Sequence, residues 1–280
     1  MTATSALTQF RVSTPVPGYW RVVFSNPPIN LLNSTTIREI RNLVEQIEET
    51  PDLKVVVFAS EHPDFWMARY DLSDTNPVAF APTESGLTHF IDSTLRLNEA
   101  CAISIACIRG RVRGGGSEFA LTCDLRFASR EQSLFGQPEV GVGILPGGGA
   151  VERLAALVGP ARALEIIASS DDYDAATAEL YGWVNRAIAD EQLDDFVDRF
   201  ARRLASFDAG SLAATKVFVR RHATSPEDYQ ETLHALRGLL ATSSTNDRRK
   251  DLALRAQAAG PDFELRLGHY LEPSIEVQPG

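Results

Sequence analysis

Short apolar runs alternate with segments of helical periodicity through the first half of the chain. Four of these runs predict strands, at 19–24, 54–59, 102–108 and 125–128. Between the first two, polar N-cap side chains at 33–36 open a predicted helix that Pro51 ends. The apolar residues of that helix recur at helical spacing: Ile37, Ile40, Leu43, Val44 and Ile47. A strand, a helix and a further strand in this order predict a right-handed crossover, and therefore an α/β fold.

Helical patterns dominate farther along the chain. A loop rich in Pro, Ser, Thr and Asp covers 74–85, and helices are predicted at 87–100 and 117–123. From Ala150 onward helical patterns prevail, and the stretch from about 211 to 271 holds no strong strand candidate. We expect this last stretch to form part of a subunit interface, because it carries leucines at helical spacing: Leu233, Leu236, Leu239 and Leu240.

Composition and charge narrow the class of protein. With 44% hydrophobic and 23% charged residues, the 280-residue chain has the make-up of a globular protein with a large core. A net charge of −10 argues against nucleic-acid binding, which needs a basic face. No apolar run approaches the roughly 20 residues that span a bilayer, and residues 1–6 lack the features of a signal peptide. We therefore expect a cytoplasmic protein with no membrane or nucleic-acid partner, and with three buried, reduced thiols: Cys101, Cys107 and Cys123.

Two glycine-rich segments, 110–116 and 136–149, carry the candidate chemistry. In the first, Gly114, Gly115 and Gly116 join a predicted strand to a predicted helix. The free N–H groups and the dipole of a helix start can bind phosphate or stabilise an oxyanion. The spacing fits neither the dinucleotide fingerprint nor the phosphate loop, because GxGxxG and GK[ST] are both absent. Close packing of helix against strand would by itself explain such a glycine triplet.

Each glycine-rich segment is accompanied by a glutamate in an apolar setting. Glu118 lies in the first turn of its predicted helix, where an acid commonly interacts with the helix dipole. Glu139 lies in the second segment and could equally be a surface acid. If the two carboxyl groups were buried together, their pKa values would be raised, which suits general acid–base chemistry. Their spacing along the chain leaves open whether they meet.

Four segments of the chain, taken together, resemble one family. The glycine-rich segments, extended to 106–124 and to 135–154, resemble the two signatures of the enoyl-CoA hydratase/isomerase (crotonase) family. Residues 26–33 resemble its N-terminal motif, and residues 176–186 are similar to its leucine-glycine-leucine-valine segment. The match runs in order over roughly residues 18 to 220.

The resemblance implies an architecture. The fold class is then α/β: a crotonase-like spiral of ββα units over residues 1–205, with a C-terminal helical domain over 206–280 that serves oligomerisation. Members of the family form trimers, often as dimers of trimers. A homotrimer or a dimer of trimers is therefore expected here.

The resemblance also implies an activity. The family stabilises a thioester enolate with two backbone N–H groups, carried over here as those of Tyr70 and Gly115. Its hydratases use two glutamates, which Glu118 and Glu139 match. The implied reaction is hydration of a 2-enoyl-CoA, as in fatty acid metabolism. Glu118 would assist the attack of a shared water on C3, and Glu139 would deliver the proton to C2. CoA is then part of the substrate, and neither a metal nor a separate cofactor is implied.

Residues 65–72 depart from the family's AFSAGADL-like loop. Arg69 stands where the family has glycine, and Tyr70 replaces the small residue that supplies the first donor. We expect Arg69 to recognise an anionic group on the substrate, or to pair with an active-site glutamate until substrate arrives. We predict substrate contacts for Ala68, Arg69, Arg113, Gly114 and Pro138. The resemblance implies contacts with CoA for Ile29, Ala68 and Asp71.

Three arginines, Arg109, Arg111 and Arg113, stand where the family's signature usually has neutral residues. They either pair with acids such as Glu118, Glu139 or Asp124, or recognise an anion. Two alternatives to hydration stay open. One is isomerisation, or C–C bond hydrolysis, of a different substrate that carries a carboxylate or lacks CoA. The other is a non-catalytic protein in which Arg69 and Arg113 neutralise the two glutamates.

Overall fold

The computed structural model describes residues 7–77, 81–221, 238 and 241–260. The chain divides into two compact units, residues 1–201 and 202–280. Helix α7 (Asp190–Ala205) crosses the boundary between them. The candidate site lies entirely in the first unit.

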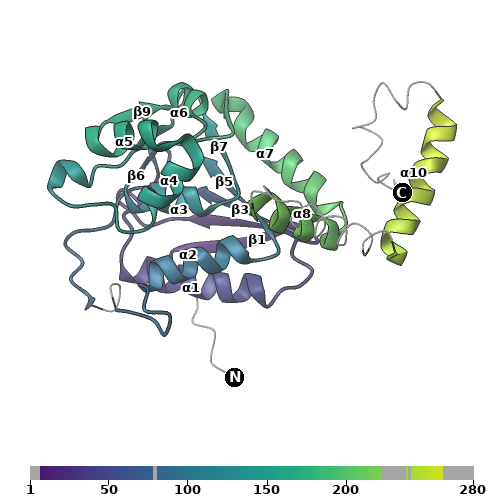
Figure 1. Cartoon of the computed structure of the whole chain (residues 1–280), viewed down its shortest axis with the longest axis horizontal. Helices are drawn as coiled ribbons and strands as arrows, with labels where there is room; N and C mark the ends of the chain where they lie inside the picture. The colour runs from purple at the N-terminus through teal and green to yellow at the C-terminus, as the bar shows by residue number, and fades with distance from the viewer. Residues whose placement is uncertain (1–6, 78–80, 222–237, 239–240, 261–280) are drawn as a thin grey trace. The chain divides into compact units, whose positions relative to one another are not determined.

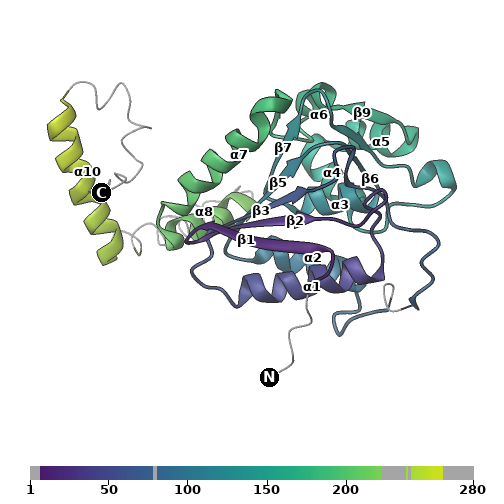
Figure 2. The ribbon, with the colours of Figure 1, turned by 180° about the vertical axis from the view of Figure 1, so that it is seen from behind.

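A six-stranded sheet forms the centre of the first unit (Figures 1 and 2). Its order is β1 (Phe10–Val16), β2 (Tyr19–Phe24), β3 (Val55–Ser60), β5 (Ile103–Ile108), β7 (Leu125–Ser129) and β10 (Arg186–Ile188). Only β1 and β2 pair antiparallel; every other neighbouring pair is parallel. Parallel strands are covered on both faces, which explains why the first five residues of β3 are all buried and apolar. The four predicted strands are confirmed.

A second, smaller sheet shows how the chain winds. It contains β4 (Phe65–Met67), β6 (Arg111–Arg113), β8 (Leu134–Gly136) and β9 (Asp172–Asp174). Along the chain three of the long strands are each followed by a short strand and then by a helix, in the repeats β3–β4–α2, β5–β6–α3 and β7–β8–α4. The helices are α2 (His89–Glu99), α3 (Gly115–Thr122) and α4 (Ala150–Val158). The expected spiral of ββα units is therefore confirmed.

Helix α1 (Ser34–Glu48) begins at Asn33, whose side chain accepts from the backbone N–H of Thr36 in a capping box. It buries the predicted apolar face and lies beside α2 below the large sheet in both views (Figures 1 and 2). The first unit also contains η2 (Val140–Val142), α5 (Pro160–Ser169) and α6 (Ala175–Tyr181).

The described parts of the second unit contain α8 (Ala209–Arg221) and α10 (Ser243–Ala259). The four leucines proposed for a subunit interface, Leu233, Leu236, Leu239 and Leu240, lie outside the described residues. No helix in the described part of the chain combines the length and the apolar character that crossing a bilayer requires.

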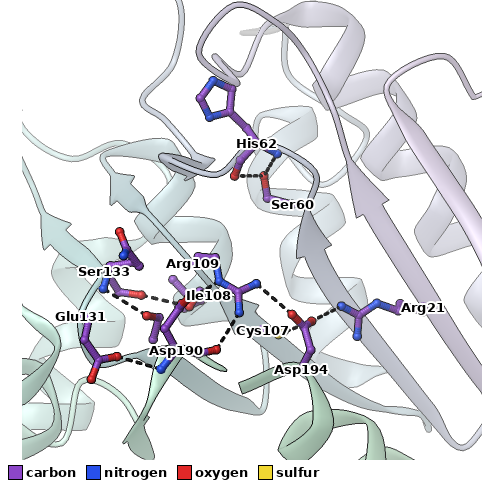
Figure 3. Close-up of polar contacts among 12 residues, drawn as sticks. Arg21, Ser60, His62, Cys107, Ile108, Arg109, Glu131, Ser133, Asp190 and Asp194 are labelled. Carbon is purple, nitrogen blue, oxygen red and sulfur yellow. Dashed lines mark hydrogen bonds and ion pairs between the residues drawn. The ribbon is translucent and has the colours of Figure 1, made fainter. Parts of the chain in front are cut away.

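A chain of ion pairs fastens α7 to the large sheet (Figure 3). Asp194 accepts from Arg21 at 2.5 Å and from Arg109 at 2.9 Å, and Arg109 also donates to Asp190 at 2.7 Å. Burial alone would raise the pKa of Asp194, but the two guanidinium groups outweigh it and the net pKa is lowered. Burial raises the pKa of the neighbouring Cys107 thiol to about 12, so this cysteine is an inert thiol as expected.

The other two cysteines differ from each other. Cys123 is buried, as predicted, at the C-cap of α3. The expectation that Cys101 is buried was wrong: it is exposed. Its position explains the difference, because it lies in the bend that follows α2, after the last residue of the apolar face.

Candidate active site

One cavity of about 590 Å³ is lined in part by residues that follow the short strands β4, β6 and β8. Its lining is mostly apolar, and it includes both predicted glutamates. The lining residues are Leu32, Ile37, Arg69, Tyr70, Leu72, Thr88, Phe90, Gly115, Glu118, Pro138, Glu139, Ile144, Leu145, Gly147 and Gly148. A mostly apolar cavity with a few polar groups is typical of a small-molecule site.

Glu118 is held in the cavity wall by helix α3. Only 4% of its surface is exposed. The start of α3 presses against β4 so closely that a Cβ on Gly116 would lie 2.0 Å from the carbonyl oxygen of Met67. Glycine at this position therefore sets the depth at which Glu118 enters the cavity.

The carboxylate of Glu118 caps a helix other than its own. Its Oε1 accepts from the backbone N–H of Gly148 at 2.6 Å and from that of Ala150 at 3.3 Å, at the start of α4. Burial raises the pKa of Glu118, and the two N–H groups and Arg153 oppose that rise. No hydrogen bond reaches Oε2 from the described part of the chain, so this oxygen can face a ligand. Glu118 thus lies in the first turn of its own helix, and its carboxylate also caps the start of α4.

Glu139 lies just after β8, at the N-cap of η2. Its Oε2 is buried without a hydrogen-bond partner among the described residues. Burial raises the pKa of Glu139 to about 7, and the charge of Glu118 adds to the rise. The two glutamates therefore line one cavity, and the charge of Glu118 acts on Glu139. An exposed, isolated surface acid at 139 is not what the structure shows.

Two backbone N–H groups meet near these acids. The N–H of Gly115 is at the first position of α3, where no intrahelical acceptor is available. A Cβ on Gly115 would lie 3.8 Å from the backbone nitrogen of Tyr70, so the two residues adjoin. Leu32 pairs with the carbonyl of Arg69 and the N–H of Asp71. Tyr70 lies between Arg69 and Asp71, and in such a parallel bridge its N–H points away from Leu32.

Gly114 allows this junction to form. Its φ of +48° and ψ of −126° are accessible to glycine and strained for other residues. A Cβ here would lie 2.7 Å from Oε1 of Glu139 and 3.4 Å from Cβ of Arg69. Glu139 and Arg69 therefore flank Gly114, which adjoins the cavity without being one of its lining residues.

Arg69 and Tyr70 both line the cavity. Nη1 of Arg69 donates to the carbonyl oxygen of Tyr70 at 3.0 Å. The Tyr70 hydroxyl donates to Asp74 at 3.2 Å, and Asp74 also accepts from the backbone N–H of Ser34 at 2.6 Å. Burial raises the pKa of Tyr70 to about 12, and Asp74 adds to the rise. The loop that replaces the family's small residues is thus anchored to the start of α1.

The other predicted binding residues are less central. Pro138 lines the cavity, whereas Ile29, Ala68 and Asp71 do not. Ala68 is buried and its N–H donates to the carbonyl of Asn30, while the exposed Asp71 carboxylate accepts from Ser73. That engagement by Ser73 lowers the pKa of Asp71. Their assignment to CoA stays a prediction.

Of the two alternatives for the three arginines, pairing with acids holds for Arg109 and Arg113, but their partners are not Glu118, Glu139 or Asp124. Arg113 pairs with Asp172 and does not line the cavity, which argues against the predicted substrate contact. Arg109 pairs with Asp190 and Asp194, and Arg111 lies over the ring of Phe65. Within the described residues no ion pair neutralises either glutamate, so the non-catalytic alternative loses the arrangement on which it depended.

Arg153 is a polar neighbour of the site that the sequence reasoning missed. Its guanidinium donates to the carbonyl of Gly148 and to the hydroxyl of Thr94. One signal could have found it: a cation in the first turn of a helix opposes the helix dipole, so such a residue needs another reason to be there.

The ββα spiral and one cavity lined by Glu118, Glu139, Tyr70 and Gly115 are features that the family resemblance implies. Residues 18–264 match the family model for enoyl-CoA hydratase/isomerase. The chain belongs to the enoyl-CoA hydratase/isomerase family. The resemblance seen in the sequence is therefore confirmed.

Individual relatives agree with this assignment. The chain is 29% identical over 255 residues to a "Probable enoyl-CoA hydratase" of Mycobacterium leprae, covering 90% of this chain and 97% of that one. It is 34% identical over 189 residues to the crotonyl-CoA hydratase of Syntrophomonas wolfei, covering 66% and 72%. A crystal structure from Streptomyces avermitilis has a TM-score of 0.73 at 33% identity, with 95% and 97% of the two chains covered.

Proposed function

We propose that the protein is an enoyl-CoA hydratase that adds water across the C2=C3 bond of a 2-enoyl thioester. The observation that carries the proposal is the pair of glutamates on one apolar cavity, Glu118 buried and Glu139 half-buried, beside the N–H groups of Tyr70 and Gly115. The relatives named as hydratases support the same reaction.

In this mechanism the two glutamates play opposite roles. Glu118, ionised, takes a proton from water as the water oxygen bonds to C3. The C2=C3 electrons move toward the thioester oxygen, whose negative charge accepts hydrogen bonds from Tyr70 and Gly115. Glu139, protonated, then gives its proton to C2, and proton exchange with water restores both carboxyl groups. A pKa of about 7 keeps a large share of Glu139 protonated at neutral pH.

The experiment that tests the proposal is hydration of crotonyl-CoA, followed by loss of the enoyl-thioester absorbance. We expect turnover that depends on both glutamates. If no 2-enoyl-CoA is hydrated, while a free ketone and not a CoA ester raises the melting temperature, the isomerase or C–C hydrolase alternative is favoured.

Arg69 supports a carboxylated acyl group as the preferred substrate. Of the described residues that line the cavity, it is the only one with a positive charge. Its guanidinium contacts a neutral carbonyl, and within the described chain it forms no ion pair. A guanidinium binds a carboxylate through two parallel hydrogen bonds, so Arg69 can bind a carboxylate on the acyl group.

We therefore expect Arg69→Gly to lower kcat/KM for a carboxylated enoyl-CoA about 10–10²-fold, the worth of a hydrogen bond to a charged group. Activity on crotonyl-CoA should be kept or increased. The two substrates are compared in the same preparation, so the neutral one is the control. Equal losses on both would instead indicate a structural role for Arg69.

We also propose a homotrimer or a dimer of trimers, located in the cytoplasm, with residues 206–280 contributing to the subunit contacts. The support is the family architecture together with the helices α8 and α10. Light scattering at micromolar concentration should give the mass of three or six chains. A monomer under these conditions would contradict the proposal.

A further inference from the structure

The backbone of residues 147–150, here called the glycine hook, binds the carboxylate of Glu118 through hydrogen bonds. The N–H groups of Gly148 and Ala150 both donate to Oε1, 30 and 32 residues farther along the chain than Glu118 itself. The hook leads into α4, so the positive end of that helix dipole lies at the carboxylate. The orientation of Glu118 therefore depends on where the hook is held.

The hook packs closely against two side chains of opposite charge, those of Glu118 and Arg153. A Cβ on Gly148 would lie 2.3 Å from Oε2 of Glu118 and 2.6 Å from the ring of Phe90. A Cβ on Gly149 would lie 2.2 Å from Nη1 of Arg153, and the φ of Gly149 is +102°. A side chain at Gly148 would therefore collide with the carboxylate, and one at Gly149 with the guanidinium.

Arg153 holds the hook through the carbonyl of Gly148. Its Nη1 donates to the carbonyl of Gly148 at 2.9 Å, and its Nη2 donates to Oγ1 of Thr94 at 3.1 Å. Thr94 is fully buried on α2, and its hydroxyl donates to the carbonyl of Ile91 at 2.9 Å. The Arg153 guanidinium thus links Gly148, which helps to orient Glu118, to the buried Thr94 of α2.

The charge of Arg153 also acts on Glu118. Burial raises the pKa of Glu118, and Arg153 lowers it, while Glu152 of the same helix raises it. Glu139 is the acid that faces Glu118 from the segment after β8. From α2 the cavity is faced by Thr88 and Phe90, and neither titrates. Arg153 is therefore the one cation among the groups that act on this carboxyl in the described chain.

We infer that Arg153 is a positioning residue for Glu118: by fixing the glycine hook and placing a positive charge behind it, Arg153 keeps the Glu118 carboxylate ionised and aimed at the reacting water. The inference rests on the proposed hydratase function for its kinetic consequence, but the placement of Glu118 can be measured without any substrate.

The test compares Arg153→Met, which removes the charge and both hydrogen bonds, with Arg153→Lys, which keeps the charge alone. Arg162→Met is the matched control, because Arg162 lies on the surface of α5, over the Tyr181 ring and near its carbonyl. For each protein, kcat and KM for crotonyl-CoA are measured against pH. The titration of Glu118 is followed by carbon NMR of carboxyl-labelled glutamate, assigned with Glu118→Gln.

We expect Arg153→Met to lower kcat at neutral pH up to about 10²-fold, the loss that follows a misplacement of about 1 Å. KM should change little, and the acid limb of the pH profile and the Glu118 titration should both move to higher pH. Arg153→Lys should restore the titration and only part of kcat. If Arg153→Met does not fold, Arg153→Gln is titrated in its place, with the same expected shift.

Three results separate the ideas. An unchanged Glu118 titration in the charge-removing variant would overturn the inference, even if stability fell. A loss of kcat equal in Arg153→Met and Arg162→Met would also overturn it. If the wild-type protein hydrates no enoyl-CoA and the titration still shifts, the proposed function fails and the positioning of Glu118 by Arg153 stands.

Discussion

Replacing Glu118 by Gln should lower kcat for hydration by about 10²–10⁴-fold, the usual worth of a positioned acid or base. The amide has the shape of the carboxylate, and its oxygen can accept from the same two N–H groups of Gly148 and Ala150. The fold should therefore survive, and the loss should be chemical. Stopped-flow or steady-state hydration of crotonyl-CoA measures it.

Glu139→Gln should cause a loss in the same range, and its control is an acid of the neighbouring helix. Glu152 is exposed in the first turn of α4, so Glu152→Gln should keep nearly full activity. If Glu118→Gln and Glu139→Gln both turned over at the wild-type rate, the two-glutamate mechanism would be wrong.

The raised pKa of Glu139 adds a dependence of stability on pH. Its pKa is about 7 in the folded protein and about 4.5 in an unfolded chain. As pH rises, the unfolded chain loses this proton at a lower pH than the folded protein does. The stabilisation that protonated Glu139 gives the folded state is therefore complete below the unfolded pKa and is lost as pH rises through 7. The free energy of unfolding should decline between pH 5 and pH 8, and Glu139→Gln should remove that part of the decline. Urea denaturation across this range measures it.

The long strands could be predicted and the short ones could not. A run such as 54–59 is uniformly apolar because both faces of a parallel strand are covered, and that signal is visible locally. By contrast, β4, β6 and β8 have three residues each, too few to show a period, and β6 begins and ends with arginine. The pairing that makes them strands lies between segments far apart in the sequence.

The site shows the same division between local and distant causes. The sequence marks Gly114 and Gly116 alike, yet one is required by its backbone angles and the other by its contact with Met67. Glu118 is visible as a helix-start acid, but its partner is the start of α4, which only the folded chain brings near. The family resemblance named both glutamates. The geometry adds that they share a cavity.

Removal of the Gly115 N–H should have the second large effect on catalysis. A substitution can delete this N–H without removing a side chain. Gly115 is the first residue of α3, a position that favours proline because its N–H has no acceptor within the helix. The proposed mechanism gives that N–H a task only when negative charge forms on the thioester oxygen. Gly115→Pro deletes it and leaves the rest of the helix start in place.

Loss of one such donor lowers kcat by about 10²–10³, or roughly 2.7–4 kcal/mol of transition-state stabilisation. Gly115→Pro should show a loss of this size, with unchanged helix content by circular dichroism. Gly115→Ala is the matched control, since it keeps the N–H and adds a methyl group at ordinary contact distance, 3.7 Å from Leu32 and 3.8 Å from the Tyr70 nitrogen. The difference between the proline and alanine variants isolates the N–H from the added bulk. Because a donor used only in the transition state affects kcat more than substrate binding, KM should stay close to its wild-type value in both. Equal rates for the two variants would assign any loss to crowding and remove Gly115 from the oxyanion site.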